Sequence, residues 1–163
     1  MNNKKSYILL FYLLALTFGC KPKTELYLER GLDILSNKVN VNFDLYDGII
    51  IEEVGVIRDQ KEGTKTLVFK LNENTSMNDL LSKDVFLGVR VWIIGKNAQK
   101  RIENWDFKPN LIEVEGYKYI LKRINIKEDQ IKKMKVYLYQ EKNGRKQKMG
   151  SPLILNKVNT YND

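Results

Sequence analysis

Apolar and polar residues alternate along much of the chain with a period of two, which is the pattern of a β-strand with one buried face. Runs of this kind lie at residues 39–46, 66–71 and 134–139. A longer run, Val85–Gly95, is apolar on both faces except at Arg90 and predicts a central strand. Three further strands are expected from their apolar and β-branched residues, at Ile49–Ile57, Tyr117–Ile126 and Pro152–Val158.

Turn signals separate these runs. Asp47-Gly48 and Asn143-Gly144 are dipeptides that favour tight β-hairpins. Two short helices are expected, at Met77–Ser82 and at Glu128–Lys133. Alanine, the best helix former, occurs only at Ala98 beyond the first 19 residues. Seven or eight strands with one or two short helices predict a single antiparallel β-sandwich of the transthyretin or immunoglobulin kind.

The first 20 residues have a different character. Lys4 and Lys5 precede an apolar run, Tyr7–Phe18, which Gly19 and Cys20 follow. This run of about 12 residues is too short for a membrane-spanning helix, which needs roughly 20. The order of charge, apolar core and small residue is typical of a secretory signal peptide.

The stretch Leu16–Cys20 resembles the lipobox of bacterial lipoproteins. The resemblance implies that the Cys20 thiol receives a diacylglycerol, that the chain is cut before it, and that the new amino group is acylated. Residues 1–19 would be the cleaved signal peptide, 20–24 the acylated cysteine with a short tether, and 25–163 the β-sandwich domain. The alternatives are an uncleaved signal anchor and a cysteine buried in the core.

The residue after the cysteine bears on the location of the chain. In lipoproteins an acidic residue there often accompanies retention in the inner membrane, whereas this chain has Lys21. No acidic run of the kind that directs some lipoproteins to the cell surface follows Cys20. The resemblance therefore implies an outer-membrane lipoprotein that faces the periplasm and is attached to the membrane by its acyl chains.

Positive charge is concentrated in the last third of the chain. The whole chain has 28 Lys and Arg against 20 Asp and Glu, and residues 117–157 have 12 against 3. The densest cluster surrounds the expected hairpin at Asn143-Gly144, where it consists of Lys142, Arg145, Lys146 and Lys148. One interpretation is an electropositive contact for an acidic protein or for anionic lipid head groups. The other is a solvated tip that only prevents edge pairing. An exported chain is not expected to meet nucleic acid.

The composition excludes several kinds of catalytic site. With no His and a single Cys, the chain has no histidine-based triad, no imidazole metal ligand and no internal disulfide. Carboxylate pairs occur at Glu52-Glu53, Glu113/Glu115 and Glu128-Asp129. No metal-binding loop or nucleophile motif accompanies them. We therefore expect no catalytic, metal-binding or cofactor-binding residue, and no cofactor beyond the covalent lipid.

The two tryptophans have different surroundings. Trp92 lies within the apolar run of the central strand and is expected in the core. Trp105 lies in the polar stretch Asn104–Phe107 and is the better candidate for an exposed partner contact. Arg90 is either paired at a sheet rim or an interface residue, and the sequence leaves both open.

These observations predict a non-catalytic lipoprotein that tethers or completes a multi-protein envelope assembly. In size, lipobox, early strand (Val39–Tyr46) and the stretch Met77–Trp105, the chain is similar to the transthyretin-like outer-membrane lipoprotein of type VI secretion, which implies a secretion-system membrane complex. The alternative is an immunity or inhibitor lipoprotein that blocks a toxin or enzyme. A carrier of an apolar ligand is a third possibility and requires a cavity in the sandwich.

Overall fold

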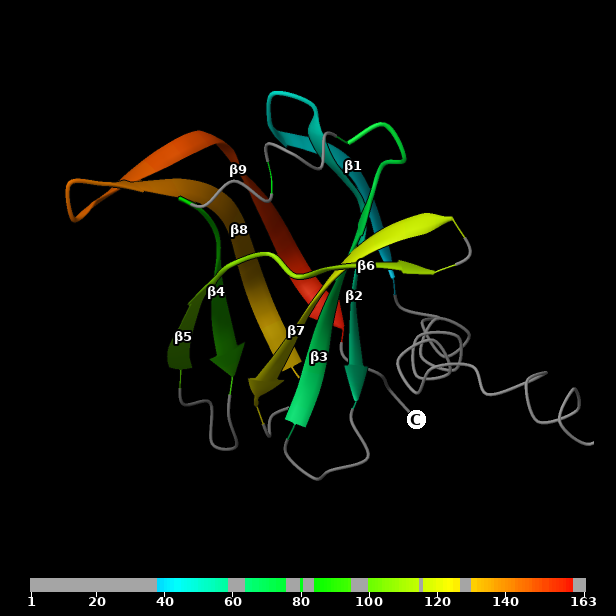
Figure 1. Cartoon of the computed structure of the whole chain (residues 1–163). Coiled ribbons are helices and arrows are strands. Elements are labelled where there is room, and N and C mark those ends of the chain that lie inside the picture. Colours follow the sequence, from blue (N-terminus) through cyan, green and yellow to red (C-terminus); the bar gives the residue numbers. More distant parts are fainter. Residues whose placement is uncertain are drawn as a thin grey trace, which may run out of the picture. The chain divides into compact units, whose positions relative to one another are not determined.

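The protein is an antiparallel β-sandwich of two sheets, seen in a computed structural model (Figure 1). The structure describes residues 38–58, 64–75, 80, 84–94, 100–114, 116–126 and 130–159. The first sheet has the order β1 (Val39–Tyr46), β2 (Ile49–Arg58), β3 (Thr64–Leu71), β7 (Tyr117–Asn125), β6 (Leu111–Val114). The second has the order β5 (Lys100–Phe107), β4 (Val85–Ile94), β8 (Gln130–Lys142), β9 (Arg145–Asn159). The predicted fold class is confirmed, and β4 is a central strand of its sheet, as predicted.

The described residues form nine strands instead of the predicted seven or eight, and β5 and β6 are the two that the sequence pattern did not indicate. β5 has the sequence KRIENWDF and is an edge strand whose outer positions are exposed to solvent. An edge strand carries charged residues that keep it from pairing with another chain, and these residues hide its apolar alternation.

The expected helix at Glu128–Lys133 is wrong where the structure describes it, because Gln130 begins strand β8. Ile131 and Met134 are both buried although they are three positions apart in the sequence, a spacing typical of a helix and not of a regular strand. The cause is a β-bulge: Trp92 pairs with Lys133 and Ile93 with Ile131, so Lys132 is an extra residue in β8. Of the other expected helix, Met77–Ser82, only Leu80 is among the described residues, and it is buried.

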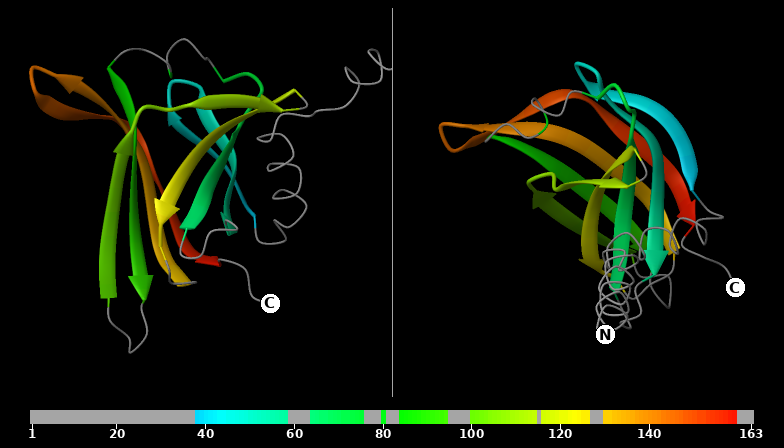
Figure 2. Two further views of the ribbon diagram at one scale, coloured as in Figure 1. Left: turned by 60° about the horizontal axis from the view of Figure 1, so that its bottom comes forward. Right: turned by 45° about the vertical axis from the view of Figure 1, so that its right-hand side comes forward.

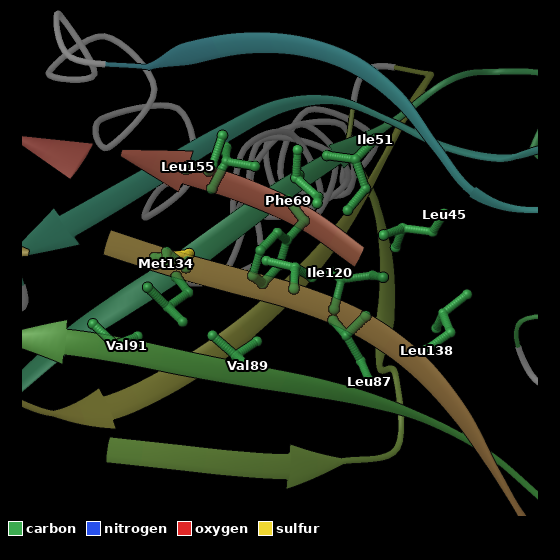
Figure 3. Packing of buried hydrophobic residues seen from close by; sticks show 14 of the residues in the cluster. Leu45, Ile51, Phe69, Leu87, Val89, Val91, Ile120, Met134, Leu138 and Leu155 are labelled. Carbon is green, nitrogen blue, oxygen red and sulfur yellow. The ribbon is translucent and has the colours of Figure 1, made fainter. Parts of the chain in front are cut away.

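The core lies between the inner faces of the two sheets. Alternate residues of β4 point inward and are almost completely buried: Val85, Leu87, Val89, Val91 and Ile93. They pack with Leu67, Phe69 and Leu71 of β3 and with the inner residues of β7, β8 and β9 in one cluster (Figure 3). Burial of this apolar surface is the main source of stability for the sandwich, at about 25 cal/mol per Å².

Strand β9 bends where it meets β1. Three residues of β9, Gly150–Pro152, lie opposite the single residue Tyr137 of β8. Gly150 has φ +58°, and a Cβ atom added to it would lie 1.8 Å from the carbonyl oxygen of Leu45 in β1. The backbones of β1 and β9, the edge strands of the two sheets, therefore approach each other closely at this glycine.

The predictions for the amino-terminal residues fall outside the described part of the chain, because Lys38 is the first residue that the structure describes. Cys20 and the residues of the expected signal peptide and tether are in the preceding part. Among the residues that are described, no helix has the length and apolar character needed to span a bilayer.

Candidate interaction surface

The outward face of the sheet β5-β4-β8-β9 carries a mixture of basic and aromatic side chains, which we call the basic face. The strand registers place these residues side by side. From β4 they are Phe86, Arg90 and Trp92, from β5 Ile102, Asn104 and Asp106, from β8 Lys133, Lys135, Tyr137 and Tyr139, and from β9 Lys146, Lys148 and Ile154. Apart from Asp106 and Glu141, the charged side chains of this face in the described strands are Lys and Arg.

The structure divides the predicted hairpin cluster between two faces of the β8–β9 ribbon. Lys142 pairs with Arg145 beside the Asn143-Gly144 turn, whereas Lys146 lies opposite Glu141 and Lys148 opposite Tyr139. Because side chains alternate along a strand, Lys146 and Lys148 share the basic face, and Lys142 and Arg145 lie on the other side. All four lysine and arginine side chains are exposed.

An ion pair holds the hairpin over the basic face. The Lys146 ammonium contacts the Asp106 carboxylate of β5. In a flat sheet β9 and β5 are three strand spacings apart, about 14 Å, which is further than a lysine side chain reaches. The hairpin must therefore curl toward the basic face, as Figures 1 and 2 show for the ribbon between β8 and β9.

Beneath this contact lies a row of aromatic rings. Phe86 and Tyr139 stack with ring centroids 5.3 Å apart, and the Tyr137 ring lies 6.2 Å from that of Tyr139. The Lys146 ammonium is 4.8 Å from the Tyr139 centroid. Gly88 makes room for Tyr137, because a Cβ atom at this position would lie 2.3 Å from the ring. The sheet thus accommodates the ring flat against its surface.

Burial and the Asp106 carboxylate shift the pKa values of this cluster. Burial raises the pKa of Tyr137, and the nearby Asp106 charge raises it further. The Tyr137 hydroxyl donates to Asp106 at 3.4 Å. Burial and Asp106 also raise the pKa of Tyr139, and the hydrogen bond to Asp106 raises the pKa of Lys146. Asp106 is therefore the acceptor around which this part of the face is arranged.

A second group of residues occupies the far end of the same face, and we call it the Trp92 patch. It consists of Arg90, Trp92, Ile102, Lys133, Lys135 and Ile154. Ile102 and Ile154 are large apolar side chains with 52% and 47% of their surface exposed. The Lys133 ammonium lies 5.3 Å from the Trp92 ring, and the Arg90 Nε donates to the Asn104 Oδ1 at 2.6 Å.

Each tryptophan lies on the face of the sheet opposite to the predicted one. Trp92 is half-buried on the outward face, not in the core, because in β4 the odd-numbered residues point inward. Trp105 is also half-buried, but it lies on the inner side of β5 and packs against the core. The apolar sequence of β4 thus reflects one core face and one partly covered outward face.

The predicted carboxylate pairs are separated from this surface. Glu52 is an extra residue in the pairing of β2 with β3, and Glu52 and Glu53 both lie near Lys70, at 3.3 and 3.8 Å. The pKa of Lys70 is raised overall. Partial burial acts to lower this pKa, but the hydrogen bond to Glu52 and the charges of both carboxylates have the larger combined effect. Glu113 is exposed opposite Lys118, and Glu115, Glu128 and Asp129 lie outside the described residues. In the described part of the chain, no group of three or more Cys, Asp or Glu side chains is placed to hold a metal ion.

Most of the basic face was not predicted from the sequence, although one signal was present. Residues Lys133, Lys135, Tyr137 and Tyr139 alternate with core residues of β8, so their common face follows from the period of two. The contribution of β4 and β5 could not be found without the strand order.

Comparison of the chain with protein-family models, with curated proteins and with solved structures finds no match.

Proposed function

We propose that this protein is a non-catalytic, lipid-anchored subunit of the bacterial envelope that binds a protein partner with an acidic surface. The β8–β9 hairpin carries this proposal. It extends past the first residue of β4, since the pairing of β4 with β8 begins at Val85 and Gln140 (Figure 1). Beyond that point the ribbon exposes Lys142 and Arg145 on one side and Lys146 on the other.

The distribution of counter-charges supports a contact and not only edge protection. Among the described carboxylates, none lies within ion-pair distance of Lys142, Arg145 or Lys148. Edge protection needs charges along an unpaired strand, whereas Lys142 and Arg145 flank the turn itself. Clustered cations of this kind attract an acidic partner and accelerate its association.

The anchor and the location are part of the proposal. The charged start, the short apolar run and Gly19-Cys20 support lipidation of Cys20, and Lys21 supports an outer-membrane site facing the periplasm. Two or more acyl chains give stable attachment where one chain does not. The protein would then tether or complete an envelope assembly, such as a secretion-system membrane complex.

The same hairpin favours a second candidate function. A narrow two-stranded ribbon that projects from a sandwich can enter a cleft, so the protein would be an immunity or inhibitor lipoprotein that blocks a toxin or enzyme. In that case the partner is one soluble protein with an acidic active-site cleft. In the assembly function the partner is a large membrane protein.

Affinity purification of the full chain in mild detergent tests the proposal. We expect one partner, identified by mass spectrometry, to be recovered at low salt and lost at high salt. The variant Lys142→Glu/Arg145→Glu should lose it as well. The variant Lys100→Glu/Lys132→Glu changes the net charge equally at the other end of the sheet, and it should retain the partner. Equal recovery with both variants would refute the hairpin contact.

The lipid anchor has its own test. Cells that express the chain are grown with a palmitate analogue, and label is expected on the wild type but not on Cys20→Ala. Label that persists on Cys20→Ala, or wild-type protein without label, would refute the anchor.

A further inference from the structure

We propose that the Trp92 patch docks on the surface of a membrane that contains anionic phospholipid. The inference extends the proposed function, because it rests on the lipid anchor to keep the domain at a membrane. It concerns the end of the basic face that is furthest from the hairpin.

The apolar side chains of the patch are exposed at its margins. Ile102 belongs to β5 and Ile154 to β9, which are the two edge strands of the sheet, and Trp92 lies between them on β4. Three strand spacings, about 14 Å, separate the isoleucines. A protein interface usually gathers its apolar residues in a central cluster with a polar rim. In the Trp92 patch, Ile102 lies opposite Trp92, whereas Ile154 lies alone at the other edge. Such separated apolar side chains suit a lipid surface, which adapts to their spacing.

The cations between these side chains match anionic head groups. Arg90, Lys133 and Lys135 occupy the middle of the patch, and none of them forms an ion pair with a carboxylate that the structure describes. Lysine side chains keep their ammonium groups at the head groups while their stems contact apolar surface. Tryptophan prefers the same interfacial depth.

The position of the patch agrees with the proposed anchor. Trp92 is two residues from the end of β4, and Ile102 is two residues from the start of β5. Figures 1 and 2 place the start of β1 toward the end of the sandwich where β4 and β9 finish, away from the hairpin turn. β1, the first described strand after Cys20 in the sequence, therefore begins toward the end that carries the patch.

The two tryptophans provide a direct test, because they lie on opposite faces of one sheet. The full chain with Trp105→Phe keeps Trp92 as its single tryptophan. It is reconstituted into vesicles of brominated phosphatidylcholine, alone or mixed with an equal part of phosphatidylglycerol. We expect quenching of the Trp92 fluorescence in the anionic vesicles and little quenching in the neutral ones. The matched variant Trp92→Phe, which reports on Trp105, should be unquenched in both.

Charge variants test the electrostatic part. Lys133→Gln and Lys135→Gln should each lower the ratio of docked to undocked molecules about fivefold, the ratio to which about 1 kcal/mol per basic residue corresponds. Both side chains lie on the outward face, so circular dichroism should show the same fold in the variants. Equal quenching in neutral and anionic vesicles, or quenching that is unchanged in both variants, would overturn the proposal.

The outcomes separate this proposal from the anchor. If the chain floats with the vesicles but Trp92 is not quenched, the docking is refuted and the anchor stands. If Trp92 is quenched in anionic vesicles but mass spectrometry finds no acyl chain on Cys20, the anchor is refuted and the docking stands. A Trp92 signal that responds to poly-glutamate and not to vesicles would assign the patch to an acidic protein instead and overturn the lipid contact.

Discussion

Among the described glycines with a positive φ, Gly150 is the one whose replacement we expect the fold to tolerate least. It has a left-handed backbone, and an added Cβ would meet the Leu45 carbonyl at 1.8 Å. Gly150→Ala should therefore lower the free energy of unfolding by more than about 3 kcal/mol, because β1 and β9 must move apart and the backbone conformation is unfavourable for alanine. Urea denaturation measures this difference.

Gly48 provides the control for that substitution. Its φ is +82°, but no atom lies within 4 Å of the position of an added Cβ. Gly48→Ala should cost only the backbone strain, about 1–2 kcal/mol. Similar losses for the two variants would show that β9 does not approach β1 at Gly150.

Burial and the Asp106 carboxylate together shift the ionisation of Tyr137. Because burial and the Asp106 charge raise the pKa of Tyr137, the folded protein holds this proton more tightly than the unfolded chain does. The resulting stability is complete below the ordinary tyrosine pKa of 10.0 and is lost as the pH rises through the higher folded pKa. Asp106→Asn should move the Tyr137 ionisation to lower pH and reduce this alkaline loss.

Ultraviolet absorbance of tyrosinate measures that ionisation. The difference between each protein and its Tyr137→Phe variant isolates Tyr137 from the other tyrosines, and urea denaturation between about pH 9 and pH 11 gives the stability. A Tyr137 titration that is identical in the wild type and in Asp106→Asn would contradict the assignment.

At the scale of elements, the bulge in β8 explains why a strand was predicted as a helix. Ile131 is buried and Lys132 is exposed as the extra residue. Ile131→Ala should therefore lower the free energy of unfolding by about 2–5 kcal/mol. Lys132→Ala should change it by less than about 0.5 kcal/mol. A loss for Ile131→Ala as small as that for Lys132→Ala would place Ile131 outside the core.

The strands differ in how well sequence alone predicts them. In β1, in β3 and in residues 134–139 of β8, apolar and polar residues alternate well enough that the core faces follow from the period of two. β4 is recognisable as central from its apolar length. Trp92 was misplaced because an apolar residue on a central strand can belong to either face, and the sequence does not show how well each face is covered. β5 was missed because an edge strand combines charged residues with a half-buried face.

The candidate surface was predictable only in part for a related reason. Lys142, Arg145, Lys146 and Lys148 are neighbours in sequence, but strand alternation assigns them to two sides of one ribbon. Conversely, Asp106 and Lys146 are 40 residues apart in sequence and meet only because the hairpin curls over the sheet. The clustering of the four basic residues therefore follows from the local sequence. The Asp106–Lys146 contact depends on the strand order and on the curvature of the sheet.

At the scale of the whole molecule, one sheet carries both proposed contacts at opposite ends. Lys133 and Lys142 are nine residues apart along β8, which corresponds to about 30 Å of strand. If the end with the Trp92 patch touches the membrane, the hairpin turn stands clear of the lipid and is free to meet a partner. If the basic face instead lies flat on the membrane, the hairpin approaches the lipid as well.

Two labelled variants distinguish these orientations. An environment-sensitive fluorophore is attached to Ile102→Cys or to Asn143→Cys in the full chain, where the proposed diacylglycerol occupies the Cys20 thiol. In anionic vesicles we expect a blue shift of the probe at residue 102 and the spectrum of a water-exposed probe at residue 143, because only the first lies at the proposed membrane end. A blue shift at both positions would indicate the flat orientation, and the hairpin could then reach an acidic partner only after the sheet leaves the membrane.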